Sequence, residues 1–305
     1  MKEGYIPKEQ RKRILLLTDD IRFPSGVGTI GKELVIHTAH HYNWHCIGAG
    51  INHPDKGKLF DLSQEINTLQ GIDDAEVIIR PNDGYGDPRL VRSIMKDQQI
   101  DAIFLITDPR YFTWLFQIEN EIRSKIPIVY LNIWDDFPAP MYNKEFYESC
   151  DTLLGISKQT VLINELVLGD KASNKIIEYV PHGLNSDIFK PIDKTSDDYI
   201  NFRKEITQGK DIDFILFFNS RNIRRKQIPD TMLAWKYFLD QLPKEKADKC
   251  LFLLHTEISS EAGTDLHAVS DVLFGENSPN IRFSTSKLST AQLNLMYNIA
   301  DAQIL

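Results

Sequence analysis

Short apolar and β-branched runs alternate with longer amphipathic stretches through the 305 residues of the chain. Such runs are typical of buried strands, whereas apolar residues three or four positions apart are typical of helices. Their alternation predicts a parallel sheet with helices on both faces. In the first part of the chain we expect strands at residues 13–18, 44–49, 76–79, 102–106, 128–132, 152–156 and 176–180. Helices are expected at residues 28–40, 88–98, 111–124 and 158–168.

A loop-rich segment with Pro181, His182, Gly183 and Asn185 interrupts this pattern after Val180. Gly and Pro are strong markers of loops, and 305 residues exceed what one core usually supports. We therefore place a domain boundary between residues 1–185 and residues 186–305. The pattern resumes with strands at 214–218, 250–255 and 281–283 and helices at 228–241 and 290–300. The predicted fold class is α/β, with two Rossmann-like domains.

The last residues of the chain, 302–305, have the pattern of the start of an apolar strand. A parallel domain that ends there leaves its sheet edge unpaired and lacks the helix that would cover that edge. We therefore expect the second domain to be incomplete.

Composition and charge narrow the class of protein. The chain is 42% hydrophobic and 26% charged, which is ordinary for a folded protein. A formal net charge of -8 excludes an overall basic field of the kind that drives non-specific nucleic-acid binding. Cys46, Cys150 and Cys250 lie far apart without CxxC spacing, which argues against a disulfide framework and a zinc site. With no signal peptide or transmembrane segment in the pattern, we expect a cytoplasmic protein that uses no metal.

A glycine-rich turn follows the first predicted strand. It includes Gly26, Val27, Gly28 and Gly31, and its GxGxxG spacing lets a backbone turn tightly and approach a phosphate at a helix N-terminus. A dinucleotide site also needs an acidic residue after the second strand, where this chain has Gly48-Ala49-Gly50-Ile51-Asn52. Three interpretations stay open: a dinucleotide site, a helix-capping turn, and a glycosyltransferase-type loop open to donor phosphates or acceptor.

A basic loop follows the first strand of the second domain, with Arg221, Arg224, Arg225 and Lys226. The carboxyl end of a parallel strand is where open α/β sheets bind ligands. Arg binds phosphate bidentately and Lys provides a compact charge, so Arg221 with Lys226 would make a diphosphate clamp. The alternative is a solvated loop, which is the interpretation that we favour for Arg224 and Arg225.

Three segments in order carry a family resemblance: the Gly26-Val27-Gly28 turn, the stretch Val-Pro-His-Gly-Leu-Asn-Ser-Asp-Ile-Phe-Lys-Pro at 180–191, and Arg221 with Lys226. Together they resemble the large retaining GT-B glycosyltransferase family that includes α-glycosyl and mannosyl transferases. The resemblance covers nearly the whole chain. Asn185 stands where the family usually has Asp, and Gln227 where it commonly has Gly.

The resemblance implies a role for each matching residue. Gly26, Val27 and Gly28 would border donor and acceptor, while Arg221 and Lys226 would hold the nucleotide diphosphate. His182 and Gly183 would lie where the domains meet, with His182 in reach of a phosphate. The stretch around Arg282 resembles the part that passes near the donor base. Asp135 and Asp136 follow a strand at the position of the family's His-Asp pair beside the reacting sugar, although the His is missing.

The implied function is transfer of a sugar from a UDP- or GDP-linked donor to an acceptor with retention of configuration, across a cleft between the domains and without an obligatory metal or cofactor. The acceptor stays open among glycan, lipid-linked sugar, protein and modified DNA. The family's Glu-x7-Glu signature would follow Leu305, beyond the end of this sequence. Two alternatives remain: a non-catalytic nucleotide- or carbohydrate-binding module, and a dinucleotide-dependent oxidoreductase.

Overall fold

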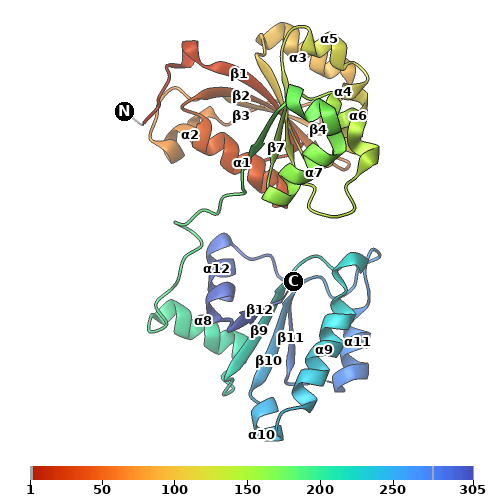
Figure 1. Ribbon diagram of the computed structural model, residues 1–305. Helices are drawn as coiled ribbons and strands as arrows, with labels where there is room; N and C mark the ends of the chain where they lie inside the picture. Colours follow the sequence, from red (N-terminus) through yellow and green to blue (C-terminus); the bar gives the residue numbers. More distant parts are fainter. Residues whose placement is uncertain (1–2, 277, 305) are drawn as a thin grey trace. The chain divides into compact units, whose positions relative to one another are not determined.

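The computed structural model describes residues 3–276 and 278–304. The chain divides between Gly183 and Leu184 into two compact units, each built on its own sheet (Figure 1). This division falls just before the boundary that the sequence predicts after Asn185. The α/β class with two Rossmann-like units agrees with the sequence prediction.

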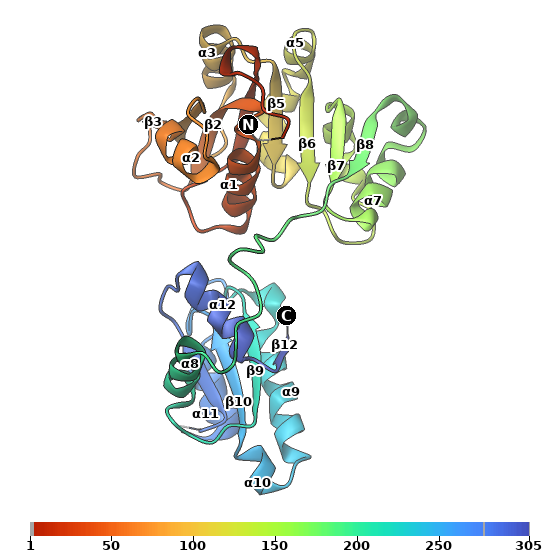
Figure 2. The ribbon, with the colours of Figure 1, turned by 90° about the vertical axis from the view of Figure 1, so that its left-hand side faces the viewer.

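The first unit contains an eight-stranded sheet in the order β3-β4-β2-β1-β5-β6-β7-β8. Neighbouring strands are parallel except β3, which pairs with β4 in the antiparallel sense. Its strands are β1 (Lys12–Asp19), β2 (Tyr42–Gly50), β3 (Phe60–Asp61), β4 (Val77–Asp83), β5 (Ala102–Ile106), β6 (Ile128–Asn132), β7 (Thr152–Gly155) and β8 (Ile176–Tyr179). Figure 2 shows β5 to β8 side by side.

Helices link these strands. They are η1 (Lys8–Gln10), α1 (Gly26–Thr38), α2 (Ser63–Gln70), α3 (Pro88–Gln98), η2 (Pro109–Phe112), α4 (Thr113–Phe116), α5 (Glu119–Arg123), η3 (Met141–Asn143), α6 (Lys144–Glu148), α7 (Lys158–Leu168) and η4 (Gly169–Asn174). The single helix expected over residues 111–124 is wrong, because the segment consists of the short pieces η2, α4 and α5. All three pieces still place apolar side chains in one core, through Phe112, Leu115 and Ile122.

Alternate residues of the central strand β1 enter two different cores. Leu15 and Leu17 join the core formed with α3, α4 and α7, whereas Ile14 and Leu16 join the core formed with α1 and α2. Successive side chains of a strand point to opposite faces of the sheet, so both faces of this sheet are covered.

The second unit has a parallel sheet in the order β11-β10-β9-β12. Its strands are β9 (Phe214–Asn219), β10 (Cys250–His255), β11 (Ile281–Ser284) and β12 (Ala302–Gln303). The helical elements are α8 (Asp197–Thr207), η5 (Arg224–Lys226), α9 (Ile228–Asp240), α10 (Lys244–Ala247), α11 (Leu266–Phe274) and α12 (Thr290–Ile299). Figure 1 shows α9 beside α11, and these two helices share a core with Phe218 and Leu254, while Phe217 packs in a second core with α8 and α12.

The segment that follows the unit boundary is bonded to α12. The side-chain amides of Asn294 and Asn298 donate to the carbonyl oxygen of Lys190 at 3.1 and 3.0 Å. The amide of Ile192 donates to Asn298 Oδ1 at 2.8 Å, and the Phe189 ring packs against Tyr297. The Phe-Lys-Pro part of the predicted motif therefore belongs structurally to the second unit.

Each sheet has a point where the direction of strand addition reverses. In the first unit the chain adds β2 and β4 on one side of β1 and then β5 on the other side. In the second unit β10 lies on one side of β9 and β12 on the other. Such switch points, at the carboxyl ends of the strands, are where open α/β sheets bind ligands.

Candidate functional site

The glycine-rich turn is anchored to the end of β1. Ser25 caps α1, because its Oγ accepts from the Gly28 amide at 2.9 Å. The Ser25 hydroxyl donates to the Asp19 carboxylate at 2.6 Å, and the Tyr85 hydroxyl donates to the other Asp19 oxygen, also at 2.6 Å. Burial and the bond to Asp19 raise the pKa of Tyr85 well above its ordinary value. The turn therefore does cap the helix, through the bond from the Gly28 amide to Ser25 Oγ.

The two glycines of the turn differ in what surrounds them. A Cβ at Gly28 would lie 2.9 Å from the Asp20 carbonyl oxygen, whereas a Cβ at Gly26 would meet nothing within 4 Å. Gly28 is therefore required by packing, and Gly26 lies open to solvent. The first amides of a helix have no acceptor within the helix, so those of Gly26 and Val27 are available to an anion at the positive end of α1.

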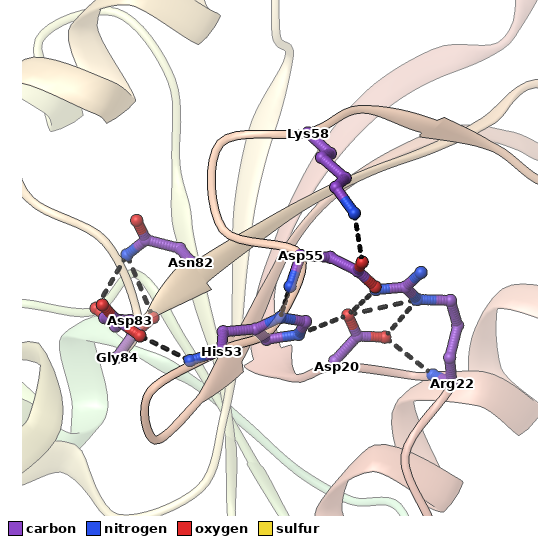
Figure 3. A network of polar contacts seen from close by, with 8 residues as sticks. All are labelled: Asp20, Arg22, His53, Asp55, Lys58, Asn82, Asp83 and Gly84. Atoms are coloured by element: carbon purple, nitrogen blue, oxygen red, sulfur yellow. Dashed lines mark hydrogen bonds and ion pairs between the residues drawn. The ribbon is translucent and has the colours of Figure 1, made fainter.

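A polar network fills the space behind this turn (Figure 3). The carboxylate of Asp20 is fully buried and accepts from the backbone amide and guanidinium of Arg22 and from His53 Nε2 at 3.0 Å. His53 Nδ1 accepts from the amide of Asp55 at 3.0 Å, so the imidazole proton is on Nε2. Burial by itself raises the pKa of Asp20, but the bonds from Arg22 and His53 outweigh it and hold that pKa below its ordinary value.

The glycines at the end of β2 make room for this network. A Cβ at Gly48 would lie 2.8 Å from Asp20 Oδ2, and one at Gly50 would lie 2.7 Å from His53 Cδ2. In the sequence this stretch stands out only for its missing carboxylate. Glycine inside a strand commonly marks a close approach of other groups, and that signal pointed to the network. The side chains of Asp20 and His53 occupy the space beside the end of β2. This packing does not favour a dinucleotide site there.

The backbone is strained where β5 ends, beside β1 at the switch point. Thr107 has φ of 111°, a conformation that a β-branched residue rarely adopts. Its carbonyl oxygen accepts from the Tyr130 hydroxyl at 2.8 Å, which helps to hold it. The carboxylate oxygens of Asp108, the next residue, accept hydrogen bonds from Arg110 Nε at 2.9 and 3.1 Å. Strained residues of this kind cluster at ligand sites.

Asp135 and Asp136 lie in the loop after β6, and both are exposed. One carboxylate oxygen of Asp136 accepts from the amide of Phe137 at 2.9 Å, as expected of a turn. Their carbonyl oxygens accept from side chains, that of Asp135 from Gln159 at 2.9 Å and that of Asp136 from Trp134 at 3.1 Å. Among the residues that the structure describes, no donor bonds to the Asp135 carboxylate.

The basic loop lies at the carboxyl end of β9, at the switch point of the second sheet. The Arg221 side chain is exposed and that of Lys226 is partly buried. Within residues 3–276 and 278–304, neither side chain forms an ion pair or a hydrogen bond. The loop itself is held by the buried Asn222, whose Nδ2 donates to the carbonyl oxygen of Thr264 at 2.6 Å and whose Oδ1 accepts from the Thr264 amide at 3.1 Å. Sequence reasoning missed Asn222, because its partners lie in a distant loop.

Arg282 is not placed with Arg221 and Lys226. Its Nη1 donates to the carbonyl oxygens of Glu205, at 3.3 Å, and Ile206, in the last turn of α8. A cation there balances the negative end of the helix. α8 leads into the amino end of β9, whereas the basic loop follows the carboxyl end of β9. The Arg282 guanidinium therefore lies at the amino ends of the strands, away from the basic loop.

His182 and Gly183 are exposed and end the first unit. No other described residue forms a hydrogen bond with the His182 ring. In the described part of the chain no three His, Cys, Asp or Glu side chains gather closely enough to hold a metal ion. No described helix has both the length and the apolar character that crossing a bilayer requires.

Comparisons with known proteins place the fold. No protein-family model and no curated protein matches the sequence. Among solved structures, a glycosyltransferase from Rickettsia africae is 15% identical, with a TM-score of 0.61 over 96% of this chain and 72% of that one. A trehalose-6-phosphate structure from E. coli bound with UDP-2-fluoro glucose is 13% identical, with a TM-score of 0.67 over 96% and 77%. A UDP-GlcNAc 2-epimerase from Neisseria meningitidis is 10% identical, with a TM-score of 0.52 over 95% and 76%.

At these identities the likeness shows the fold. The two units are Rossmann-like domains of the GT-B class.

Proposed function

We propose that this chain binds a UDP- or GDP-linked sugar on its second unit and transfers the sugar to an acceptor on its first unit. The observation that carries the proposal is the basic loop at the carboxyl end of β9. In the part of the chain that the structure describes, no acidic side chain pairs with Arg221 or Lys226 there. The fold likeness to a structure bound with UDP-2-fluoro glucose supports a nucleotide-sugar ligand of that kind.

In this proposal the two cations hold the diphosphate. Arg221 provides a planar pair of donors that matches phosphate oxygens, and Lys226 provides a second, compact charge. Asn222 keeps the loop in place through its bonds to Thr264. As the glycosidic bond breaks, negative charge grows on the diphosphate, and cations already in position stabilise it without reorganisation.

The first unit would present the acceptor. The acceptor hydroxyl oxygen bonds to the anomeric carbon as the bond to the diphosphate breaks, and the hydroxyl proton passes to the departing phosphate oxygen. The family resemblance supports retention of configuration. Gly26, Val27 and Gly28 offer amides at the start of α1, and Asp135 and Asp136 are exposed carboxylates after β6. These five residues are the acceptor-side candidates. His182 and Gly183 remain candidates beside the phosphates, and Arg282 is left out because α8 occupies it.

A second function has an observation in its favour. The epimerase from Neisseria meningitidis shares the fold, and its structure is bound to UDP-GlcNAc. An epimerase changes the sugar and leaves the nucleotide attached, so it needs no acceptor. A non-catalytic module would bind a sugar nucleotide and change nothing. An oxidoreductase is the weakest alternative, since the end of β2 offers no carboxylate to a ribose.

Product analysis distinguishes these functions. The chain is incubated with UDP-glucose, UDP-GlcNAc or GDP-mannose, with and without a mixture of acceptors, and the products are separated by anion-exchange chromatography. The proposal expects free UDP or GDP, in an amount that rises with acceptor and falls at least tenfold in Arg221→Ala/Lys226→Ala. Arg225→Ala, a change in the same loop, is the control and should keep the activity. An epimerised sugar nucleotide would favour the second function, and unchanged donors in every mixture would contradict transfer.

A further inference from the structure

Aromatic side chains gather in the first unit where β5 and β6 end. We call Tyr111, Trp134 and Tyr142 the aromatic cluster. The exposed fraction is 59% for Tyr111 and 64% for Tyr142. Tyr111 and Phe112 both lie in the segment expected as a helix over residues 111–124, and of these two only Phe112 is buried. Large aromatic side chains exposed together on a soluble protein commonly mark a binding surface.

Arg110 lies beside the Trp134 ring of the aromatic cluster. Its guanidinium lies 6.0 Å from the centre of the Trp134 ring, and the Trp134 and Tyr142 rings meet edge to face at 5.9 Å. Tyr111 is the next residue in the chain after Arg110. Asp108 takes up one edge of the guanidinium and fixes its plane. Nη1, on the other edge, bonds to no residue that the structure describes and can donate to a ligand.

The rest of the fold holds the rings of the aromatic cluster in position. Tyr111 packs against Tyr85 at 5.1 Å, and Tyr85 is bonded to Asp19 at the end of β1. Trp134 Nε1 donates to the carbonyl oxygen of Asp136. Rings that are already held in place lose little conformational freedom when a ligand stacks on them.

The groups around the rings indicate the kind of ligand. Asp135 and Asp136 directly follow Trp134, and their exposed carboxylates accept hydrogen bonds from hydroxyl groups. The carboxylates of Asp108, Asp135 and Asp136 together disfavour a polyanion such as single-stranded nucleic acid. A ligand with apolar faces for the rings and hydroxyl groups for the carboxylates fits this chemistry. A neutral saccharide has both.

We infer that the aromatic cluster with Arg110 binds a neutral saccharide, and that the acceptor is therefore a glycan. The second part rests on the proposed function, because only a transferase has an acceptor. A sugar ring stacks on Tyr111 or Tyr142, and its hydroxyl groups bond to Asp135, Asp136 and the free edge of Arg110. The transferred sugar would thus be added to an existing chain of sugars.

Saccharide binding is measured directly by isothermal titration calorimetry on the full chain. The probes are maltotriose, cellotriose, mannotriose and chitotriose, and UDP-glucose and GDP-mannose are titrated separately. The variant is Tyr111→Ala/Tyr142→Ala. Tyr237→Ala is the control, because Tyr237 is equally exposed, at 60%, on α9 of the second unit. Trp134 is kept, since its indole bond supports the loop that carries Asp136.

We expect at least one trisaccharide to bind the wild-type chain, with affinity at least tenfold lower in the double variant and unchanged in the control. Affinity for the sugar nucleotides should be the same in all three proteins, which also shows that the variant is folded. The inference is overturned if none of the four trisaccharides binds, if the double variant binds equally well, or if oligo(dT) binds the cluster instead. If saccharides bind through the cluster but no sugar nucleotide binds, the proposed function fails and the saccharide site stands.

Discussion

The carboxyl ends of β1 and β9 lie at the two switch points of the molecule, yet their charges are used in opposite ways. At the end of β1, Asp19 and Asp20 are bonded to side chains of the protein itself. At the end of β9, Arg221 and Lys226 have no such partner among the described residues. Charged side chains that are paired within the protein stabilise the fold. Charged side chains without a partner at the carboxyl ends of the strands are available to a ligand. The side chains of Asp19 and Asp20 therefore stabilise the fold, whereas Arg221 and Lys226 are the proposed ligand-binding pair.

The largest effect is expected from Asp20→Ala. This change leaves Arg22 and His53 without their buried partner, and breaking a buried ion pair on one side costs about 3 to 5 kcal/mol. Urea unfolding followed by tryptophan fluorescence measures the free energy of unfolding. Asp55→Ala removes a more exposed carboxylate of the same network and should cost much less. Equal effects of the two changes would contradict a structural role for Asp20.

A smaller effect is expected from Asn222→Ala in the basic loop. The change removes the side-chain bonds to Thr264 and leaves buried backbone groups unsatisfied, at a cost of about 1 to 3 kcal/mol. Because the loop carries Arg221, affinity for a sugar nucleotide should fall as well, even though Asn222 is 2% exposed and is not expected to reach the ligand. Calorimetry alongside urea unfolding checks both. A loss of stability with unchanged affinity for the sugar nucleotide would contradict a role of this loop in donor binding.

The smallest effect is expected from pH. The folded-state pKa of Asp20 is lowered, so its contribution to stability is present above the unfolded-state pKa of about 4 and is lost as the pH falls through the lower folded-state value. Melting temperature measured from pH 7 down to pH 3 should therefore drop more steeply in the wild-type chain than in Asp20→Asn. The loss is smaller than in Asp20→Ala, because a protonated carboxyl still forms hydrogen bonds. Parallel profiles would show that Asp20 is not the group that titrates.

Local sequence predicted much of the fold. The continuous apolar runs of β5, β6 and β10 have the bounds expected, because a buried strand with apolar side chains on both faces has a pattern that few other structures share. α8 and α11 were missed. The segment over residues 111–124 was misread as one helix, since its apolar spacing does not reveal where the backbone breaks.

The candidate site also has a part that the sequence predicted and a part that it did not. The place of Arg221 and Lys226 follows from their positions directly after an apolar strand. The engagement of Arg282 with α8 joins residues 76 positions apart, and the bond of His53 to Asp20 joins residues 33 apart. Contacts of that range depend on the packing of the whole unit, and no local pattern reports them.

Arg221 and Lys226 are proposed to bind the diphosphate of a sugar nucleotide. Isothermal titration calorimetry of UDP-glucose and GDP-mannose against the wild-type chain, Arg221→Ala/Lys226→Ala and Arg225→Ala tests this proposal most directly. A hydrogen bond to a charged group contributes about 1.5 to 3 kcal/mol, so losing both cations should weaken binding at least about a hundredfold. We predict that loss in the double variant and wild-type affinity in Arg225→Ala. Wild-type affinity in the double variant would contradict it.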